Sequence, residues 1–148
     1  MVSVVVAAYN TEKYIPKCLG SLQKQTYTDF EVIVVVDGAT DKTFDICEAF
    51  SKQDSRFVTV YRKNGGLAAA RNTGLERCTA EYVTFVDSDD YVSSDYLENL
   101  ANAIKTNNCD ISACGYILED ENGNEKYRTD YKSKLMNNEM FLNNMLIP

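Results

Sequence analysis

Two short, nearly uninterrupted apolar stretches constrain the fold of this chain most strongly. Residues 2–8 and 30–36 consist largely of valine, isoleucine and alanine. Apolar runs of this length and β-branched content are typical of strands that are buried on both faces. The intervening residues 15–25 predict one helix, with Pro16 in its first turn, where proline is tolerated. A buried strand, a helix and a second buried strand indicate a right-handed βαβ unit in a parallel sheet.

The same alternation continues along the chain. We expect a turn at 37–41 and a helix to about residue 52, a strand at 56–61, a helix at 67–77, a strand within 81–90, a helix at 95–105 and a fifth strand at 110–118. This order predicts an α/β fold: a three-layer αβα sandwich around a mostly parallel central sheet.

The pattern changes after residue 118. An Asn-Gly pair at Asn122 predicts a hairpin over 117–131, and Asn137 is placed to cap a last helix over 139–147. We expect one domain over residues 1–148. The chain stops on the apolar sequence Met-Leu-Ile-Pro, which predicts that the natural protein continues beyond it.

Charge and composition narrow the function. The net charge of −7 disfavours nucleic acid and anionic membrane surfaces as general partners. Histidine is absent from the sequence, which removes the commonest general base and zinc ligand. The five cysteines form no CxxC pair and are odd in number, so we expect reduced thiols and a cytoplasmic protein. Apolar runs are too short for a membrane span.

Polar residues follow four of the expected strands. They are Tyr9 with Asn10, Asp37, Asn64 with Gly65 and Gly66, and Asp87 with Ser88 and Asp89. Because parallel strands end at one edge of a sheet, we expect these residues to converge on one cleft. Each also has an ordinary structural explanation: Asp37 as the cap of the next helix, Tyr9 as edge packing, the glycines as a plain loop and Arg71 as solvated surface.

Three carboxylates lie within four positions at the end of the fourth expected strand, on Asp87, Asp89 and Asp90. Such a cluster is repulsive unless the acids share a cation, and oxygen ligands suit Mg²⁺ or Mn²⁺ rather than zinc. The alternative is a solvated turn, with Ser93 or Ser94 capping the next helix.

Four segments carry a resemblance to a known family. Residues 3–10 (SVVVAAYN), 36–43 (VDGATDKT), 64–74 (NGGLAAARNTG) and 85–90 (FVDSDD) resemble, in order and spacing, the family 2 glycosyltransferases of the GT-A fold. The second segment has alanine at 39 and lysine at 42, where relatives more usually have serine and glycine. This departure leaves Asp37 in place.

The resemblance implies a nucleotide-diphosphosugar donor, most often UDP-linked. In this pattern Tyr9 stacks on the base, Asp37 accepts a hydrogen bond from the uracil N–H, and Asp89 coordinates Mn²⁺ or Mg²⁺. The implied donor-binding residues are Ala8, Tyr9, Asp37, Asn64, Gly66, Arg71, Asp87 and Ser88, and the implied metal ligands are Asp89 and Asp87, which with Ser88 form a DxD motif. Residues 1–90 would form the donor-binding half, and residues 110–148 would begin the acceptor part.

Family membership further implies transfer with inversion to a saccharide or glycolipid acceptor in cell-surface polysaccharide synthesis. The resemblance also implies that this synthesis takes place at the inner face of the membrane. A carboxylate would act as general base. Glu119, Asp120 and Glu121 are available, but the sequence assigns none of them, and we expect the base in a C-terminal part beyond this chain.

Rival interpretations fit less well. A Rossmann dehydrogenase needs GxGxxG after the first strand, and a sugar-phosphate nucleotidyltransferase needs a glycine-rich basic loop there, whereas residues 7–12 contain no glycine. A response regulator needs acids at that position, and Tyr9 and Asn10 stand there instead. The strongest competitor is a donor-binding part that has no turnover of its own.

Overall fold

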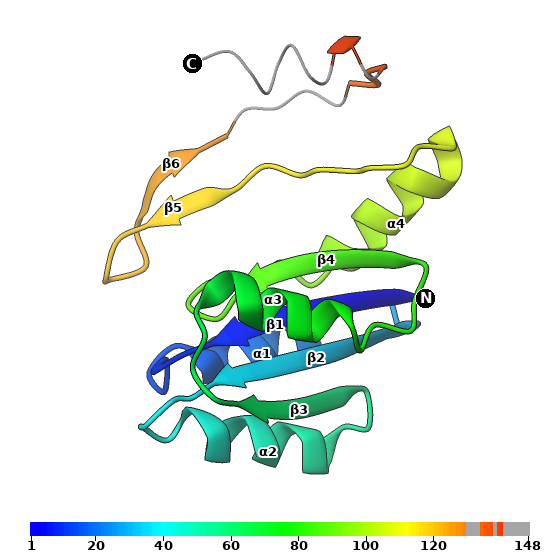
Figure 1. Cartoon of the computed structure of the whole chain (residues 1–148). Coiled ribbons are helices and arrows are strands. Elements are labelled where there is room, and N and C mark those ends of the chain that lie inside the picture. Colours follow the sequence, from blue (N-terminus) through cyan, green and yellow to red (C-terminus); the bar gives the residue numbers. More distant parts are fainter. Residues whose placement is uncertain (130–133, 138, 141–148) are drawn as a thin grey trace. The chain divides into compact units, whose positions relative to one another are not determined.

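A computed structural model describes residues 1–129, 134–137 and 139–140 (Figure 1). The chain divides into two compact units, Met1–Asn99 and Leu100–Pro148, which are described separately. The expected organisation as a donor-binding half and an acceptor part stays a prediction.

The first unit alternates strands and helices as expected. Its elements are β1 (Val2–Ala8), α1 (Ile15–Gln23), β2 (Phe30–Asp37), α2 (Thr43–Gln53), β3 (Phe57–Arg62), α3 (Leu67–Leu75) and β4 (Tyr82–Asp87), and α4 (Tyr96–Asn107) begins in this unit and ends in the next. The strands form one parallel sheet in the order β3-β2-β1-β4. Their arrows all point the same way in Figure 1, so the four carboxyl ends lie along one edge.

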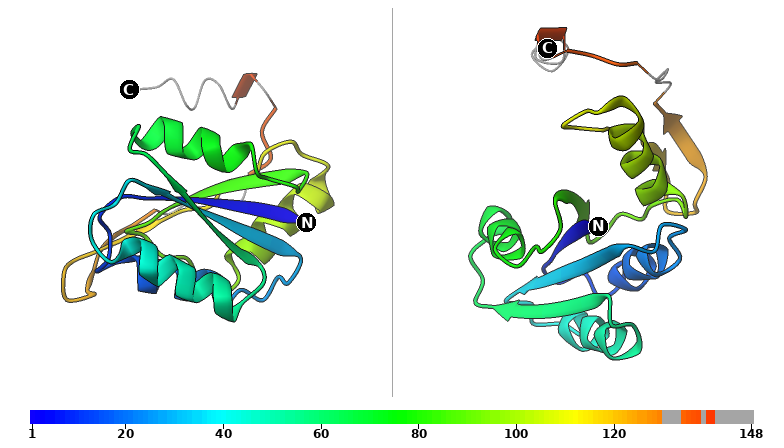
Figure 2. Two further views of the ribbon diagram at one scale, coloured as in Figure 1. Left: turned by 60° about the horizontal axis from the view of Figure 1, so that its bottom comes forward. Right: turned by 90° about the vertical axis from the view of Figure 1, so that its right-hand side faces the viewer.

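Helices cover both faces of this sheet, which confirms the predicted αβα arrangement. Helix α3 lies on one face, and α1 and α2 lie on the other (Figures 1 and 2). Under α3, Ile33 and Val35 of β2 pack with Val60 and Ala70. On the opposite face α1 buries Ile15, Cys18, Leu19 and Leu22. Helix α3 packs closely on β1: a Cβ added at Gly74 of α3 would overlap Cγ1 of Val5.

Strand burial follows position in the sheet. The central strands β1 and β2 are buried along nearly their whole length, which confirms the two-sided burial inferred from their sequences. Strand β4 lies at one end of the strand order, and its residues alternate: Val86 is buried, whereas Val83 and Phe85 are exposed.

The predicted fifth strand is wrong. Residues 111–116 form no strand, and β5 (Ile117–Glu119) pairs antiparallel with β6 (Glu125–Arg128) rather than joining the parallel sheet. The local turn explains this pairing: Oδ1 of Asp120 accepts hydrogen bonds from the amides of Asn122 and Asn124. A short turn closes a hairpin at little entropic cost, which favours the neighbouring segment as partner. The predicted hairpin is confirmed as far as residue 129.

The remaining expectations concern the C-terminal residues. Oδ1 of Asn137 accepts a hydrogen bond from the Met140 amide at 2.9 Å, which confirms Asn137 as a cap. The predicted helix over 139–147 lies mostly outside the described residues. Within the described part of the chain, no helix is long and apolar enough to cross a membrane.

The fit of α3 against β1 predicts opposite effects for two glycine substitutions. Gly74→Ala should destabilise the chain by about 1–3 kcal/mol, because its methyl group overlaps Val5. Gly20→Ala in α1 should stabilise it by about 0.5–1 kcal/mol, because its methyl group meets no atom within 4 Å and alanine favours helix. Urea unfolding measures both changes, and equal stability of the two variants would contradict the packing.

Two buried cysteines give a second test of the core. Burial raises the pKa of Cys18 and of Cys47 to about 12. Since the thiolate is the reactive form, neither should be alkylated by iodoacetamide at pH 8 in the native chain. Cys114 is exposed, although partial burial also raises the pKa of its thiol, so it should be alkylated in the native chain but more slowly than after unfolding. Mass spectrometry before and after unfolding checks this, and native labelling of Cys18 or Cys47 would refute the described packing.

Candidate functional site

The candidate site lies at the carboxyl edge of the parallel sheet. The register pairs Asp37 at the end of β2 with Arg62 at the end of β3, and Asp87 at the end of β4 with Ala7 of β1. Neighbouring strands are about 4.8 Å apart, so β2 and β4, which flank β1, are separated by about 10 Å. The chain thus brings the ends of all four strands within the span of one small ligand.

Asp37 is buried beneath this edge of the sheet and holds the loop between β3 and α3. Only 3% of the residue is exposed. Its carboxylate accepts hydrogen bonds from the Gly65 amide at 3.0 Å and from the Gly66 amide at 2.7 Å, and Nε of Arg62 lies 3.4 Å from Oδ1. The side-chain amide of Asn64 donates to the Asp37 carbonyl at 3.0 Å. Asp37 therefore fixes the loop that leads into α3, 28 residues further along the chain.

Two glycines make this close approach feasible. Gly38 has a φ of +71°, and a Cβ there would lie 2.6 Å from the Asn64 nitrogen. Gly66 has a φ of +87° and immediately precedes α3, whose first residues have no side-chain cap. Left-handed backbone and a backbone-to-backbone contact both favour glycine. The helix begins next to the buried carboxylate, which satisfies amides that a helix start otherwise leaves unpaired.

Arg62 is a site residue that the sequence analysis missed. Its guanidinium lies beside both Asp37 and Gly65, and in the described residues its buried Nη1 atom has no hydrogen-bond partner. In sequence it stands between Tyr61 and Lys63, which are exposed residues, and resembles solvated surface. The signal available was its position as the last residue of a strand, where the other site residues also lie.

The loop after β1 presents Tyr9 to solvent. Ala8 is buried as the last residue of β1, whereas Tyr9 is 52% exposed. Asn10 adopts a φ of 52°, and its side-chain oxygen accepts a hydrogen bond from the Thr40 amide at 2.8 Å. The loop after β1 is thus tied to the loop after β2. About half of the Tyr9 surface is thus accessible to a ligand.

The acidic residues after β4 form a tight turn. The Asp90 amide donates to the Asp87 carbonyl at 3.0 Å, Ser88 is buried, and the other three side chains are exposed. Nη2 of Arg71, from α3, donates to Oδ1 of Asp87 at 2.6 Å. Arg71 therefore contacts the acidic turn and is not merely solvated surface.

The turn carries an excess of negative charge. Partial burial raises the pKa of Asp90 above its ordinary value, and the nearby charges of Asp89 and Asp87 raise it further. Behind the turn, the Cys18 thiol donates to the Asp87 carbonyl, so a neutral group faces it from α1. Arg71 neutralises one carboxylate only. An additional cation would relieve the remaining repulsion.

The donor set fits a divalent cation that is shared with a ligand. Asp87 and Asp89 supply carboxylate oxygens, the ligand type that Mg²⁺ and Mn²⁺ favour. In the part of the chain that the structure describes, no group of three or more acidic or cysteine side chains could hold a metal alone. A metal here would therefore complete its coordination with water and with ligand oxygens.

Asp37 does not cap helix α2. Oδ1 of Asp41, and not Asp37, accepts a hydrogen bond from the Thr43 amide at the start of α2. Asp37 instead serves the start of α3. Gly65 and Gly66 are consequently more than a plain loop, because their amides are bound by that carboxylate.

Comparison with known proteins agrees with this arrangement. The sequence matches the family described as "Glycosyl transferase family 2" over residues 3–147. It is 45% identical over 120 residues to the glycosyltransferase GlyA of Streptococcus pneumoniae, an alignment that covers 81% of this chain and 17% of GlyA. The chain thus spans about a sixth of that relative.

Solved structures share the fold. S. aureus TarS 1-349 in complex with UDP-GlcNAc has a TM-score of 0.67 and 39% identity, over 71% of this chain and 31% of that chain. TarS is a poly(ribitol-phosphate) β-N-acetylglucosaminyltransferase. The mannosyltransferase PcManGT of Pyrobaculum calidifontis, in complex with GDP-Man and Mn²⁺, has a TM-score of 0.62 and 28% identity, over 70% of this chain and 32% of that chain.

These matches confirm the resemblance carried by the four sequence segments, and they confirm a GT-A sheet. The family match extends over nearly all of the chain, well beyond the segments from which the resemblance was inferred. The chain therefore belongs to glycosyl transferase family 2.

Proposed function

We propose that this chain is the donor-binding part of a metal-dependent inverting glycosyltransferase that uses a UDP-sugar. One observation carries the proposal: the exposed ring of Tyr9, the loop fixed by Asp37 and the carboxylates of Asp87 and Asp89 lie at one edge of one sheet. The separation of about 10 Å between β2 and β4 suits a nucleoside diphosphate with its base near β2 and its diphosphate near β4. The UDP-GlcNAc bound by TarS supports the choice of base.

The base would be recognised by Tyr9 and Asp37. Stacking on an aromatic ring contributes about 0.5–1.5 kcal/mol beyond buried area. A carboxylate has about four acceptor positions, and the two glycine amides and Arg62 occupy part of that capacity. The remaining capacity would accept the uracil N3–H. Cytosine has no donor at that position, so this contact would select uridine nucleotides.

The diphosphate would lie between α3 and the acidic turn. The start of α3 after Gly66 offers backbone amides and a favourable helix dipole to phosphate oxygens. Arg71 would hold Asp87 in place and contribute positive charge. Asp89, with Asp87, would bind Mn²⁺ or Mg²⁺. When bound, such an ion neutralises the charge that develops on the leaving diphosphate.

The general base is proposed to lie outside residues 1–129. Inverting transfer needs a carboxylate that takes the proton of the acceptor hydroxyl. Asp120 is occupied in the hairpin turn, where the Asn124 hydrogen bonds lower its pKa. Nothing marks Glu119 or Glu121 for the role. The acceptor, proposed to be a saccharide or glycolipid of cell-surface polysaccharide at the inner membrane face, would meet that further part.

A second candidate function is donor binding without turnover in this chain. The described hairpin favours it, because the carboxylate of Asp120 is engaged in the turn and no contact marks Glu119 or Glu121 as a general base. The two functions share the donor site and differ in catalysis. UDP binding without release of UDP from UDP-GlcNAc, together with turnover in a longer form of the protein, would identify the binding part.

A thermal-shift panel of UDP, GDP, CDP and dTDP, each with and without Mn²⁺, tests the proposal directly. We expect UDP with Mn²⁺ to stabilise the chain most, because the base contact and the cation act on one ligand. Stabilisation by GDP equal to that by UDP would refute the proposed recognition of uracil by Tyr9 and Asp37. The absence of any nucleotide effect would overturn the proposed function.

Asp89→Asn should remove the metal dependence of UDP binding. We expect the affinity in Mn²⁺ to fall about tenfold or more, to the value measured without metal, because metal and UDP affinities are reciprocally coupled. Since Asp89 is exposed, the unfolding free energy should change little. Isothermal titration calorimetry measures the affinities. Glu81→Gln, an equal charge change at the start of the β4 segment, is the control, and retained Mn²⁺ dependence in Asp89→Asn would refute the ligand role.

Asp37→Asn should weaken both the fold and the nucleotide. The amide NH₂ group cannot accept from a glycine amide, so we expect a loss of about 1–3 kcal/mol in unfolding free energy and about tenfold in UDP affinity. Asp45→Asn, an exposed position in α2, is the charge-matched control. If Asp37→Asn loses stability but binds UDP normally, Asp37 organises the loop only.

A further inference from the structure

Arg62 lies beside Asp37, the proposed base contact, and the strands themselves place it there. It is the last residue of β3, and the parallel register pairs it with Asp37, the last residue of β2. Val35 and Val60 pack under α3, and Asp37 and Arg62 each follow one of them by two residues. Because alternate residues of a strand share a face, both charged side chains lie on the α3 face of the sheet.

Gly65 makes room for this arginine. Its backbone does not require glycine, since Gly65 is not among the glycines of positive φ. A Cβ at this position would lie 2.6 Å from Nη2 of Arg62 and 3.2 Å from its Cζ. The guanidinium therefore occupies the space that a side chain at residue 65 would take. The Gly65 amide also donates to Asp37, so the glycine, the carboxylate and the arginine are in mutual contact.

The contact between Arg62 and Asp37 is mainly one of charge. Nε of Arg62 lies 3.4 Å from Oδ1 of Asp37, which is longer than the usual N–H···O distance of about 2.7–3.2 Å. In the part of the chain that the structure describes, the buried Nη1 atom of Arg62 has no hydrogen-bond partner. A buried N–H without an acceptor costs free energy, and an apolar side chain would avoid that cost. The charge of Arg62 is therefore the property that distinguishes it at this position.

Arg62 is the cation that the described residues place against the Asp37 carboxylate. Ala8, at the end of the neighbouring strand β1, is uncharged, Lys63 is exposed, and Arg71 of α3 donates to the acidic turn after β4. Burial penalises a charged group, whereas an adjacent opposite charge favours it. Arg62 therefore opposes the effect of burial on Asp37.

We propose that Arg62 is a positioning residue that sets the base specificity of the donor site by keeping Asp37 ionised. This inference rests on the proposed function. An ionised carboxylate only accepts hydrogen bonds, which fits the N3–H of uracil. The uncharged acid carries an O–H that can donate to N3 of cytosine, which has no hydrogen. By holding the charge on Asp37, Arg62 excludes cytidine nucleotides and admits bases with an N3–H.

The ratio of UDP affinity to CDP affinity in Mn²⁺, measured by calorimetry at pH 8 and pH 6, tests this role. The ratio cancels the diphosphate and metal contacts, which both nucleotides share. We expect the unchanged chain to prefer UDP equally at both pH values. In Arg62→Gln the ratio should fall about fivefold or more from pH 8 to pH 6, because protonation of Asp37 removes the acceptor for uracil and supplies a donor for cytosine.

Three further variants separate charge from packing. Arg62→Lys keeps the charge and should restore a ratio that does not depend on pH. Arg77→Gln, an equal loss of charge at an exposed position after α3, is the matched control and should behave as the unchanged chain. Gly65→Ala displaces the guanidinium without removing it, so its ratio should again depend on pH. Gly65→Ala decides the question if Arg62→Gln does not fold.

The outcomes distinguish this inference from the proposed function. A ratio in Arg62→Gln as high and as constant as in the unchanged chain would overturn the role of Arg62 and leave the donor site in place. Equal losses of UDP and CDP affinity at both pH values would overturn it as well, since they indicate a structural role only. A ratio that falls with pH in the unchanged chain would contradict it too. Absence of nucleotide binding in the unchanged chain would refute the proposed function itself.

Discussion

The buried carboxylate of Asp37 joins parts of the chain that lie far apart in sequence. It ends β2, yet its hydrogen bonds go to the amides of Gly65 and Gly66, which lead into α3 on the other side of β3. Burying a charge without such partners would cost several kcal/mol. Asp37 therefore links the end of β2 to the glycine loop and to the start of α3. The exposed groups of the site lie along this edge.

The four acidic residues of the site differ in burial and in hydrogen bonding. Asp37 is internally satisfied and structural in its main contacts, with limited remaining capacity for a base. Asp87, Asp89 and Asp90 lie close together in one turn, and partial burial, followed by the charges of Asp89 and Asp87, raises the pKa of Asp90. Arg71 of α3 forms an ion pair with Asp87 at 2.6 Å. This contrast is the reason for proposing a cation at the β4 end of the edge and the nucleotide base at the β2 end.

The sequence predicted the parallel sheet well because its central strands are uninterrupted runs of valine and isoleucine. It predicted the positions of Tyr9, Asp37 and Asp87 because parallel strands share an edge. It failed for residues 110–118, since an apolar run does not reveal whether its partner is a parallel neighbour or the local hairpin closed by Asp120. It missed Arg62, whose partner Asp37 is 25 positions earlier and becomes a neighbour only through strand register.

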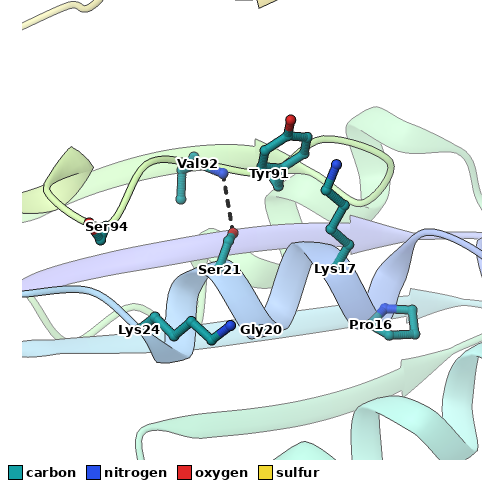
Figure 3. Close-up of a pocket in the computed structure, with 8 residues that line it drawn as sticks. All are labelled: Pro16, Lys17, Gly20, Ser21, Lys24, Tyr91, Val92 and Ser94. Atoms are coloured by element: carbon teal, nitrogen blue, oxygen red, sulfur yellow. Dashed lines mark hydrogen bonds between the residues drawn. The ribbon is translucent and has the colours of Figure 1, made fainter. Parts of the chain in front are cut away.

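Helix α1 illustrates the same limit. The apolar residues that α1 buries are visible in the sequence as a helical pattern. The contact of Ser21 with Val92, 71 residues later (Figure 3), is not visible in the sequence, because the two residues meet only in the folded chain. Local patterns thus identify candidate groups, and tertiary contacts decide which of them share a site.

A crystal structure of the chain with UDP and Mn²⁺ tests the central claim most directly. We expect uracil against the Tyr9 ring, near Asp37, and one Mn²⁺ ion that joins Asp89 to the diphosphate oxygens. A nucleotide bound away from the strand ends, or an ion held without Asp87 and Asp89, would contradict it.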